Sequence, residues 1–441
     1  MKKEVSVILI LALCLSLSSC NIDLGFGDYD YEKHNIAPGD EKINVGNNDY
    51  KQDGYAGFID KLSLFAAKLS HEIYLSGDLD ENIAISPISV YMALALATEC
   101  ANGETRDEIL RAVGVSYEEV KNFTKTLYAY TNRTFYSNGE NKDVSAFEEL
   151  ANSIWADNDV ELKENGVSVL AKDFNCDLFS VDYATDEAND AINAYIKDKT
   201  HGLIDGSVDF SPETLITLIN TFYLKEIWNN YGEELTFTDI AYAFVNADGS
   251  QTNTKLLKGY YSDGKVYEGE GYSSFFTKTN HNFNIKFILP NDGHSIDEVF
   301  TAENIYHINS IKDYGTLDNE NMLRHHTRVF FPEYEASYDG NIGDVLKNSF
   351  NIEKMFSPEE CDFSNITDET VVCDGVVHKC ELKVNRKGIE GAAVTYIPLC
   401  GAVGPGQYKD VYHDFIVDRA FGFIITDNYG VVLFCGVVNN V

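Results

Sequence analysis

Basic residues are scarce in this chain. Its 441 residues include 34 Lys and Arg against 70 Asp and Glu, which gives a formal net charge of −36. A surface of this charge repels phosphate, so the composition argues against nucleic acid as a partner. Hydrophobic residues make up 44% of the chain, enough for a large core. A solvated acidic surface is the simplest interpretation of the charge.

The cysteines lack the spacing of a metal site or of a disulfide framework. None of the nine falls in a C-x-x-C pair. Cys14 and Cys20 lie near the N-terminus. The other seven are scattered and odd in number: Cys100, Cys176, Cys361, Cys373, Cys380, Cys400 and Cys435. We therefore expect no disulfide framework and no metal site, and we interpret most of these thiols as small buried hydrophobes.

The usual signatures of catalysis are also missing. The chain has no G-x-S-x-G elbow, no H-E-x-x-H pair, no P-loop and no dinucleotide-binding glycine pattern. Catalytic triads are assembled by folding, so these absences do not exclude an enzyme. No local pattern predicts an enzyme, however, and none predicts a cofactor.

The N-terminus has the pattern of an export signal. Lys2 and Lys3 precede an apolar run, Val5 to Leu17, that is too short to span a bilayer as a mature helix. The following Leu17-Ser18-Ser19-Cys20 resembles the bacterial lipobox. This implies a lipoprotein signal peptide over residues 1–19 and a lipid on Cys20, which would anchor the protein in the bacterial cell envelope, at the outer membrane or cell surface. Ordinary signal cleavage, with Cys20 incidental, is the alternative.

Two regions follow the signal. Residues 20–54 are rich in Asp, Asn, Gly and Tyr and show no hydrophobic periodicity, which predicts an acidic flexible tether. Residues 55–441 contain no further linker, repeat or low-complexity tract. The length would allow several domains, but the missing boundary favours one large domain.

The body mixes helical and strand patterns. Apolar residues three or four apart predict a helix over 58–73, and a capping box at Thr105 predicts the start of another helix that Gly114 ends. Residues 215–225 are typical of a central strand covered on both faces, and residues 421–439 of two strands about a tight turn. Helices dominate the first part and strands the last, so the expected class is α+β.

Several ordered motifs resemble the serpin family, from about residue 57 to residue 439. One motif begins N-I-A-I-S-P-I-S, another reads I-N-T-F-Y-L-K-E-I-W, and V-V-H-K at 376–379 matches the strand that leads into the family's reactive loop. The C-terminal segments D-F-I-V-D-R-A-F and L-F-C-G-V-V-N-N are similar to the family's last strands. Matching positions in the first two motifs and the turn after the first are Asn82, Ser86, Pro87, Ser89, Ala101, Gly103, Thr105, Asn220, Tyr223, Lys225 and Trp228. Cys100 and Glu226 stand where the family has glycine.

The resemblance implies both a fold and a mechanism. The fold has helices packed around three β-sheets, with a large central sheet and an exposed reactive loop. The implied function is a single-use protease trap. The protease cuts the loop and forms an acyl-enzyme, and the loop then inserts into the central sheet as a new strand and drags the protease with it.

The resemblance places the hinge of this loop at Gly388 and the cut near Ala402–Val403. A segment that is first a loop and then a central strand needs small side chains. The hinge residues are Gly388, Ile389, Glu390, Gly391, Ala392, Ala393, Val394 and Thr395. On the family's register the odd-numbered residues from Ile389 to Thr395 would face the core after insertion, and Glu390 would face outward.

Three loop residues depart from the family pattern. Arg386 replaces a glutamate, Ile389 replaces a small residue, and Pro398 lacks the N–H that a central strand donates. The loop is also longer than usual on its C-terminal side. These departures concern the mechanism of trapping more than the fold.

The resemblance also implies a polar cluster beneath the strands that must part. Its members are Ser86, Ser89, Asn220 and His378, and Trp228 matches the residue at the top of the opening. By themselves, His378 would be interpreted as a hydrogen-bonded core histidine and Trp228 as a core residue.

The expected protein is therefore a monomeric protease inhibitor, not an enzyme. Small residues around Ala402 suit serine proteases of the elastase type, and papain-like cysteine proteases are a second class of target. A non-inhibitory serpin that serves as a binding or adhesion module is the alternative.

Overall fold

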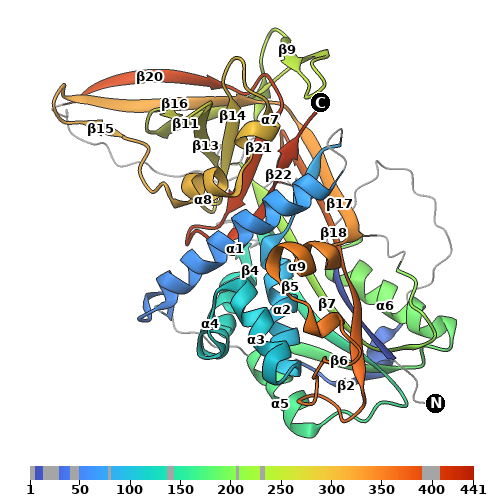
Figure 1. Cartoon of the computed structure of the whole chain (residues 1–441). Coiled ribbons are helices and arrows are strands. Elements are labelled where there is room, and N and C mark those ends of the chain that lie inside the picture. Colours follow the sequence, from blue (N-terminus) through green and yellow to red (C-terminus); the bar gives the residue numbers. More distant parts are fainter. Residues whose placement is uncertain are drawn as a thin grey trace.

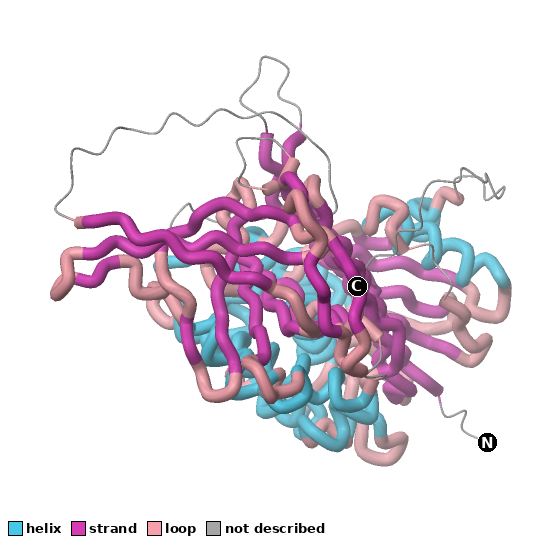
Figure 2. The backbone as a smooth tube through the Cα atoms, turned by 90° about the horizontal axis from the view of Figure 1, so that it is seen from above, coloured by secondary structure: helices cyan, strands magenta, loops and turns pink. Residues whose placement is uncertain are grey.

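The computed structural model describes residues 5–12, 29–39, 49–77, 81–136, 144–204, 208–228, 234–389 and 408–441. Within these ranges the strands form three larger sheets, and most helices lie in the lower half of the view in Figure 1. Viewed from above, strands run through the middle of the molecule and helices flank them (Figure 2). The α+β class predicted from the sequence is confirmed.

The largest sheet, called the main sheet below, has nine strands. Along its path these are β1 (Val5–Ala12), β18 (Val371–Asn385), β19 (Gly388–Ile389), β7 (Thr214–Ile227), β5 (Val144–Asp157), β6 (Cys176–Val181) and β2 (Asn35–Ala37). Off this path, β17 (Tyr334–Asn341) pairs with β18, and β4 (Arg133–Tyr136) pairs with β5. Strand β7 coincides with the predicted central strand, and twelve of its fourteen residues are buried.

Three further sheets complete the strand content of the described residues. The six-stranded sheet contains β12 (Tyr267–Glu268), β13 (Tyr272–Lys278), β14 (Asn284–Pro290), β21 (Phe421–Thr426), β22 (Val432–Val438) and β3 (Ile83–Ile85). The five-stranded sheet contains β15 (Leu317–Asp318), β16 (Leu323–Phe331), β11 (Leu257–Asp263), β8 (Thr236–Phe237) and β20 (Lys409–Ile416). Strands β9 (Tyr242–Val245) and β10 (Gln251–Thr254) form a small hairpin.

The helices follow the apolar patterns of their sequences. They are α1 (Tyr55–Ser76), α2 (Pro87–Cys100), α3 (Gly103–Val113), α4 (Tyr117–Tyr130), α5 (Glu164–Asp173), α6 (Asp186–Lys199), α7 (Ile296–Val299), α8 (Ala302–Ser310) and α9 (Gly343–Phe350), with short 3₁₀ turns at Tyr31–His34, Asp49–Lys51 and Lys354–Phe356. Helix α1 contains the predicted helix 58–73. Every residue of α2 is buried, as expected of a helix that is apolar on all sides.

The predicted capping box at Thr105 is wrong. Helix α3 begins two residues earlier, at Gly103, and Asn102 at its N-cap makes no side-chain cap. The Thr105 hydroxyl instead accepts a hydrogen bond from the backbone N–H of Asp362 at 3.0 Å. Its oxygen is therefore used by a distant loop. The predicted end is correct, because Gly114 caps α3 in the left-handed conformation.

Part of the predicted tether is packed against the body. Strand β2 pairs with β6 at the edge of the main sheet. Tyr31 lies edge-on to Phe179 and Tyr195 and donates a hydrogen bond to Asp198 at 2.7 Å. This stretch has no periodicity, so its own pattern did not predict structure, and distant residues supply the surface that holds it. Residues 20–28 and 40–48 lie outside the described ranges.

The predicted signal peptide contributes a strand to the full-length chain. Strand β1 lies parallel to both β7 and β18 and pairs with each. Residues 13–28, with Cys20 among them, lie outside the described ranges, so the cleavage and lipidation of Cys20 stay predictions. Among the described residues, no helix combines the length and apolarity that a membrane crossing requires.

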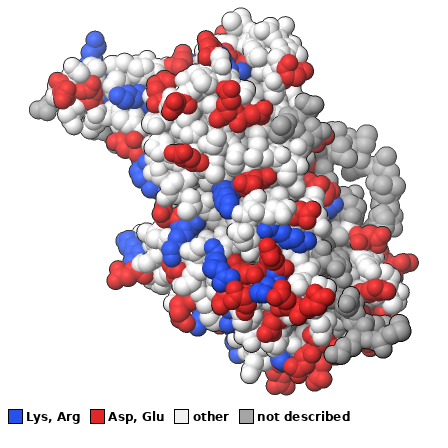
Figure 3. Space-filling model, in the orientation of Figure 1, with Lys and Arg blue, Asp and Glu red and all other residues white. Residues whose placement is uncertain are grey.

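Charge and thiols are distributed as the composition suggests. Acidic side chains are spread from top to bottom of the face seen in Figure 3, and basic side chains gather near its middle.

Five of the six described body cysteines are buried, and Cys361 is partly exposed. Cys400 lies outside the described residues. Within these residues, no three His, Cys, Asp or Glu side chains form a candidate metal site.

Two glycines allow a test of the packing. A Cβ at Gly436 in β22 would lie 1.8 Å from the carbonyl oxygen of Ile83 in β3, whereas a Cβ at Gly57 on the exposed side of α1 would meet nothing within 4 Å. We expect Gly436→Ala to lower the free energy of unfolding by about 3 kcal/mol, because the two strands must separate. Gly57→Ala should raise it by about 0.5–1 kcal/mol, because alanine favours the helix. Urea unfolding measures both, and equal stability of the two variants would contradict this packing.

Candidate functional site

The main sheet contains a strand-wide space between β7 and β18, which we call the slot. In the described part of the chain these two strands pair with inserted segments and not with each other. Strand β1 fills the lower part, where Leu11 lies opposite both His378 and Asn220. Strand β19 fills the upper end. The slot can therefore hold a segment in either direction, because β1 runs parallel and β19 antiparallel to its neighbours.

The predicted hinge already lies in the upper end of the slot. Gly388 pairs with Asn385 and Ile227, and Ile389 pairs with Val384 and Glu226. Ile389 is 1% exposed, so its side chain faces the core, as the register predicts. A Cβ at Gly388 would lie 2.0 Å from the carbonyl oxygen of Glu226. Only glycine allows β7 to approach this closely.

The turn before the hinge is held by charged groups. Arg386 Nε donates to Glu234 at 2.5 Å, and the Arg386 N–H donates to Glu333 at 2.7 Å. The arginine that departs from the family pattern therefore has acidic partners on two other segments. The Trp228 indole N–H donates to the carbonyl oxygen of Asn385 at 2.7 Å, which joins the end of β7 to the end of β18.

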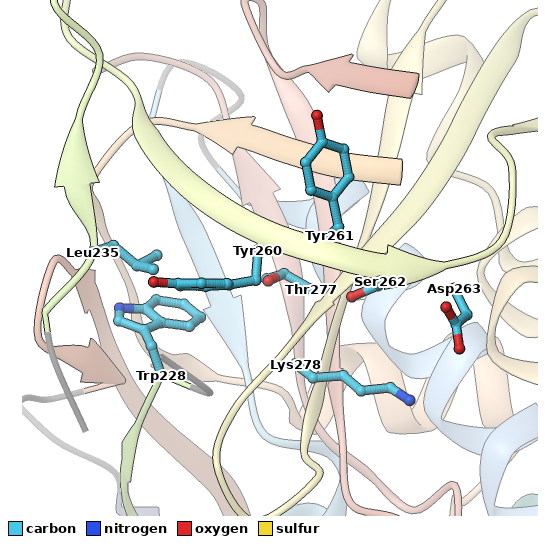
Figure 4. A pocket seen from close by; sticks show the side chains of 8 residues that line it. All are labelled: Trp228, Leu235, Tyr260, Tyr261, Ser262, Asp263, Thr277 and Lys278. Atoms are coloured by element: carbon cyan, nitrogen blue, oxygen red, sulfur yellow. The ribbon is translucent and has the colours of Figure 1, made fainter. Parts of the chain in front are cut away.

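Trp228 also lines a small open pocket of about 220 Å³ (Figure 4). In this view Trp228, Leu235 and Tyr260 lie together at one side, while Asp263 and Lys278 lie at the other and Tyr261 points away. The pocket has no cluster of catalytic groups, so we assign it no chemistry. Trp228 itself is 1% exposed and is best described as a buried residue that joins the two strand ends.

The four polar residues predicted beneath the slot lie together. Ser89 Oγ donates to Asn220 Oδ1 at 2.5 Å, and the Ser86 N–H donates to His378 Nε2 at 3.2 Å. Asn220 also donates to Asn152 Oδ1 at 2.7 Å. All four predicted residues are fully buried. Ser86 Oγ and His378 Nδ1 have no partner within the described residues.

His378 is held in its neutral form. Burial lowers the pKa of His378 to about 3, because a charged imidazolium would lose its hydration there. Nε2 accepts the Ser86 N–H, so the proton of the neutral ring lies on Nδ1. A second proton would have to displace the Ser86 hydrogen bond. The polar cluster therefore favours a closed, uncharged arrangement.

One further contact at the upper end of the slot was not predicted from the sequence. Glu226, which stands where the family has glycine, is within 2.9 Å of His281 Nδ1. The glycine-to-glutamate departure was the only signal in the sequence, and nothing in it pointed to His281, which is 55 residues away.

The remaining predicted site residues lie outside the described ranges. These are Glu390, Gly391, Ala392, Ala393, Val394, Thr395, Pro398, Ala402, Val403 and Cys20. The chain re-enters the described part at Tyr408, next to β20.

The burial of His378 predicts a loss of stability in acid. Its pKa in the folded protein lies below that of an unfolded histidine, near 6.5, so the unfolded state binds a proton first as the pH falls. Stability present above about pH 6.5 should therefore decline toward pH 3, by at most about 1.4 kcal/mol per pH unit from this group. His378→Asn should make the acid side of the stability profile shallower in urea unfolding between pH 7.5 and 5. His294→Gln, an exposed control, should not. Parallel profiles for all three proteins would refute this assignment.

Comparison with known proteins identifies the family. The family model described as "Serpin (serine protease inhibitor)" matches residues 60–441. Iripin-1 of Ixodes ricinus is 28% identical over 393 residues, which cover 82% of this chain and 89% of the relative. Neuroserpin of Homo sapiens is 25% identical over 376 residues, which cover 81% of this chain and 85% of the relative.

Solved structures agree in fold. Serpin48 of the insect Tenebrio molitor superposes with a TM-score of 0.69 at 21% identity, covering 88% of this chain and 99% of the other. The thermophilic serpin Tengpin, in its native state, gives a TM-score of 0.66 at 24% identity, covering 93% of this chain and 98% of the other. The expected fold is confirmed, and the chain belongs to the serpin family.

Proposed function

We propose that this serpin inhibits proteases by trapping them, with serine proteases of the elastase type as its preferred targets and a cut near Ala402–Val403. One observation carries the proposal: Gly388 and Ile389 already pair with both walls of the slot. The hinge thus occupies the first position of an inserted strand before any cut. Further insertion would therefore lengthen an existing set of strand hydrogen bonds. It would not need a separate nucleation step.

The existing register supports a complete insertion. Each further loop residue would lie one residue earlier on both β7 and β18. Continued from Ile389, this register brings Thr395 opposite Asn220 and His378. His378 Nδ1 and Ser86 Oγ, which have no partner among the described residues, are suitable partners for a threonine hydroxyl. The polar cluster could therefore bind the inserted loop as well as the closed sheet.

We further propose that the mature protein is anchored by a lipid on Cys20 and is displayed on the bacterial cell envelope. The lipobox-like Leu17-Ser18-Ser19-Cys20 supports this. Cleavage before Cys20 would also remove β1, whose residues up to Leu11 lie in the rows that residues from Thr395 onward would take. The cleavage that accompanies export of the protein would then also empty the lower part of the slot.

A non-inhibitory binding or adhesion module is the second candidate. The position of β1 favours it, since a slot that stays filled cannot accept the loop. Pro398, outside the described residues, would also cost one ladder hydrogen bond.

Mixing the protein with a panel of serine and cysteine proteases separates the two functions. A covalent complex that survives denaturing electrophoresis supports trapping, and only clipped product supports the binding module.

Ile389 provides the sharpest test of insertion. Ile389→Arg would place an unpaired charge in the core at the first inserted position, which costs several kcal/mol. We expect the loop to be cut at the same bond and at a similar rate, with release of free protease in place of a covalent complex. Ile389→Thr, closer to the family pattern, should trap at least as well as the parent. Mass spectrometry of the released peptide locates the cut, and efficient trapping by Ile389→Arg would overturn the register.

The predicted signal peptide, residues 1–19, provides an independent test. In a bacterium with lipoprotein signal peptidase, the wild-type protein should fractionate with membranes and trap protease. Cys20→Ala should keep residues 1–19, and with them β1 in the slot, so it should be cut without trapping. A purified chain of residues 20–441 is the control and should trap. If the Cys20→Ala protein matches the wild type in both membrane retention and trapping, neither the anchor nor the competition between β1 and the loop holds.

A further inference from the structure

A carboxylate and an imidazole lie in contact directly beneath the hinge. Glu226, next to the last residue of β7, is 0% exposed. Its carboxylate accepts a hydrogen bond from the Ile227 N–H at 2.8 Å, and its two oxygens lie 2.9 and 3.0 Å from His281 Nδ1. His281 belongs to the turn between β13 and β14 and stacks on Phe135 of β4 at 4.2 Å between ring centroids. The ring is thereby fixed against the carboxylate.

This pair lies on the face that the inserting loop must cover. Ile389 is the cross-strand partner of Glu226, and Val384 lies on the other side of Ile389. Residues directly opposite each other in a sheet project to the same side, and both Ile389 and Val384 are buried. The hinge therefore lays an apolar side chain beside the Glu226 carboxylate. Glu226 is already fully buried with Ile389 in place, so the paired hinge is the state that removes its carboxylate from water.

The other charges near Glu226 are already engaged. Glu148 on β5 is a diagonal neighbour on the same face and pairs with Arg133 of β4 at 2.7 Å. Asp427, in the turn after β21, is also buried and adds negative charge near Arg133. From the slot side, β18 and β19 contribute the apolar Val384 and Ile389. Among the described residues, His281 is the basic side chain in contact with Glu226.

We infer that the Glu226–His281 pair is a positioning pair for the hinge and couples loop insertion to pH. This inference rests on the trapping function proposed above. With one shared proton the pair carries no net charge, and the apolar Ile389 can lie against it. After loss of that proton a bare carboxylate remains, and covering it with apolar side chains is costly unless it is paired.

The direction of the effect follows from the environment of the pair. Burial raises the pKa of Glu226, and the hydrogen bond from His281 partly opposes the rise. The shared proton belongs to the pair as a unit. As the pH rises and the proton leaves, insertion should slow while loop cleavage continues. The protein should then release more proteases for each one that it traps.

The test measures how many inhibitor molecules are consumed per protease trapped, from pH 6.0 to 8.5, with a protease whose own activity is recorded at each pH. For the parent we expect this number to rise about threefold or more across the range. Glu226→Gln should flatten the profile near its low-pH value, because no charge can form. His281→Gln removes the partner that lowers the pKa of Glu226, so the carboxyl should stay protonated to higher pH and the rise in inhibitor consumption should shift to higher pH. The double variant should show the flat profile of Glu226→Gln.

The main sheet contains a matched control pair. Glu149 lies next to Glu148 on β5, so its side chain faces the opposite side of the sheet, where it pairs with His201 at 2.7 Å. Glu149→Gln should leave the pH profile of the parent unchanged. Should Glu226→Gln fold poorly, Glu226→Gly, the residue of the family pattern, removes the same carboxylate. A role limited to stability would change the melting temperature without changing the pH profile of trapping.

The outcomes separate this inference from the proposed function. If the parent forms no covalent complex at any pH, the proposed function fails. If the parent traps protease but shares its pH profile with Glu226→Gln and Glu226→Gly, trapping stands and the positioning role of Glu226 and His281 is refuted.

Discussion

The two strands that line the slot need a third segment to complete their hydrogen bonds. Strands β7 and β18 each present backbone N–H and C=O groups toward the space between them, and such groups must be paired or hydrated. At the bottom β1 pairs with both walls, and at the top β19 does the same. Whichever segment supplies those hydrogen bonds decides the state of the main sheet. A strand-wide space inside a large sheet is thus a binding site for the chain's own segments.

The upper end of the slot is held by contacts between segments far apart in the sequence. The Trp228 indole joins the end of β7 to that of β18, and Arg386 reaches Glu234 and Glu333. Glu226 and His281 add a buried pair on the inner face. Two of these residues, Arg386 and Glu226, depart from the family pattern, yet each has a partner of suitable charge. Each departure from the family pattern is therefore matched by a neighbouring side chain of opposite or complementary charge.

Helices and strands with long apolar patterns were predicted correctly, whereas the helix cap predicted from a short polar pattern was wrong. The helix over 58–73 and the central strand over 215–225 were found because their apolar residues recur with the period of the element. The capping box at Thr105 failed because its hydroxyl is bound by Asp362, a residue 257 positions later. Tyr29 to Gly39 were placed in a flexible tether because their order comes from contacts with β6 and α6 and not from their own pattern.

The amino-acid sequence alone predicted the family and the fold class, and it predicted a hinge at Gly388 and a polar cluster around His378. It did so because each of these is written as an ordered motif or a periodic pattern. The folded structure was needed to show that Gly388 and Ile389 are already paired, that β1 lies in the same slot, and that Glu226 contacts His281 beneath Ile389. Each of these features is a contact between segments that are distant in the sequence. Glu226 and His281, for example, are 55 residues apart, and no local sequence pattern indicates that they are in contact.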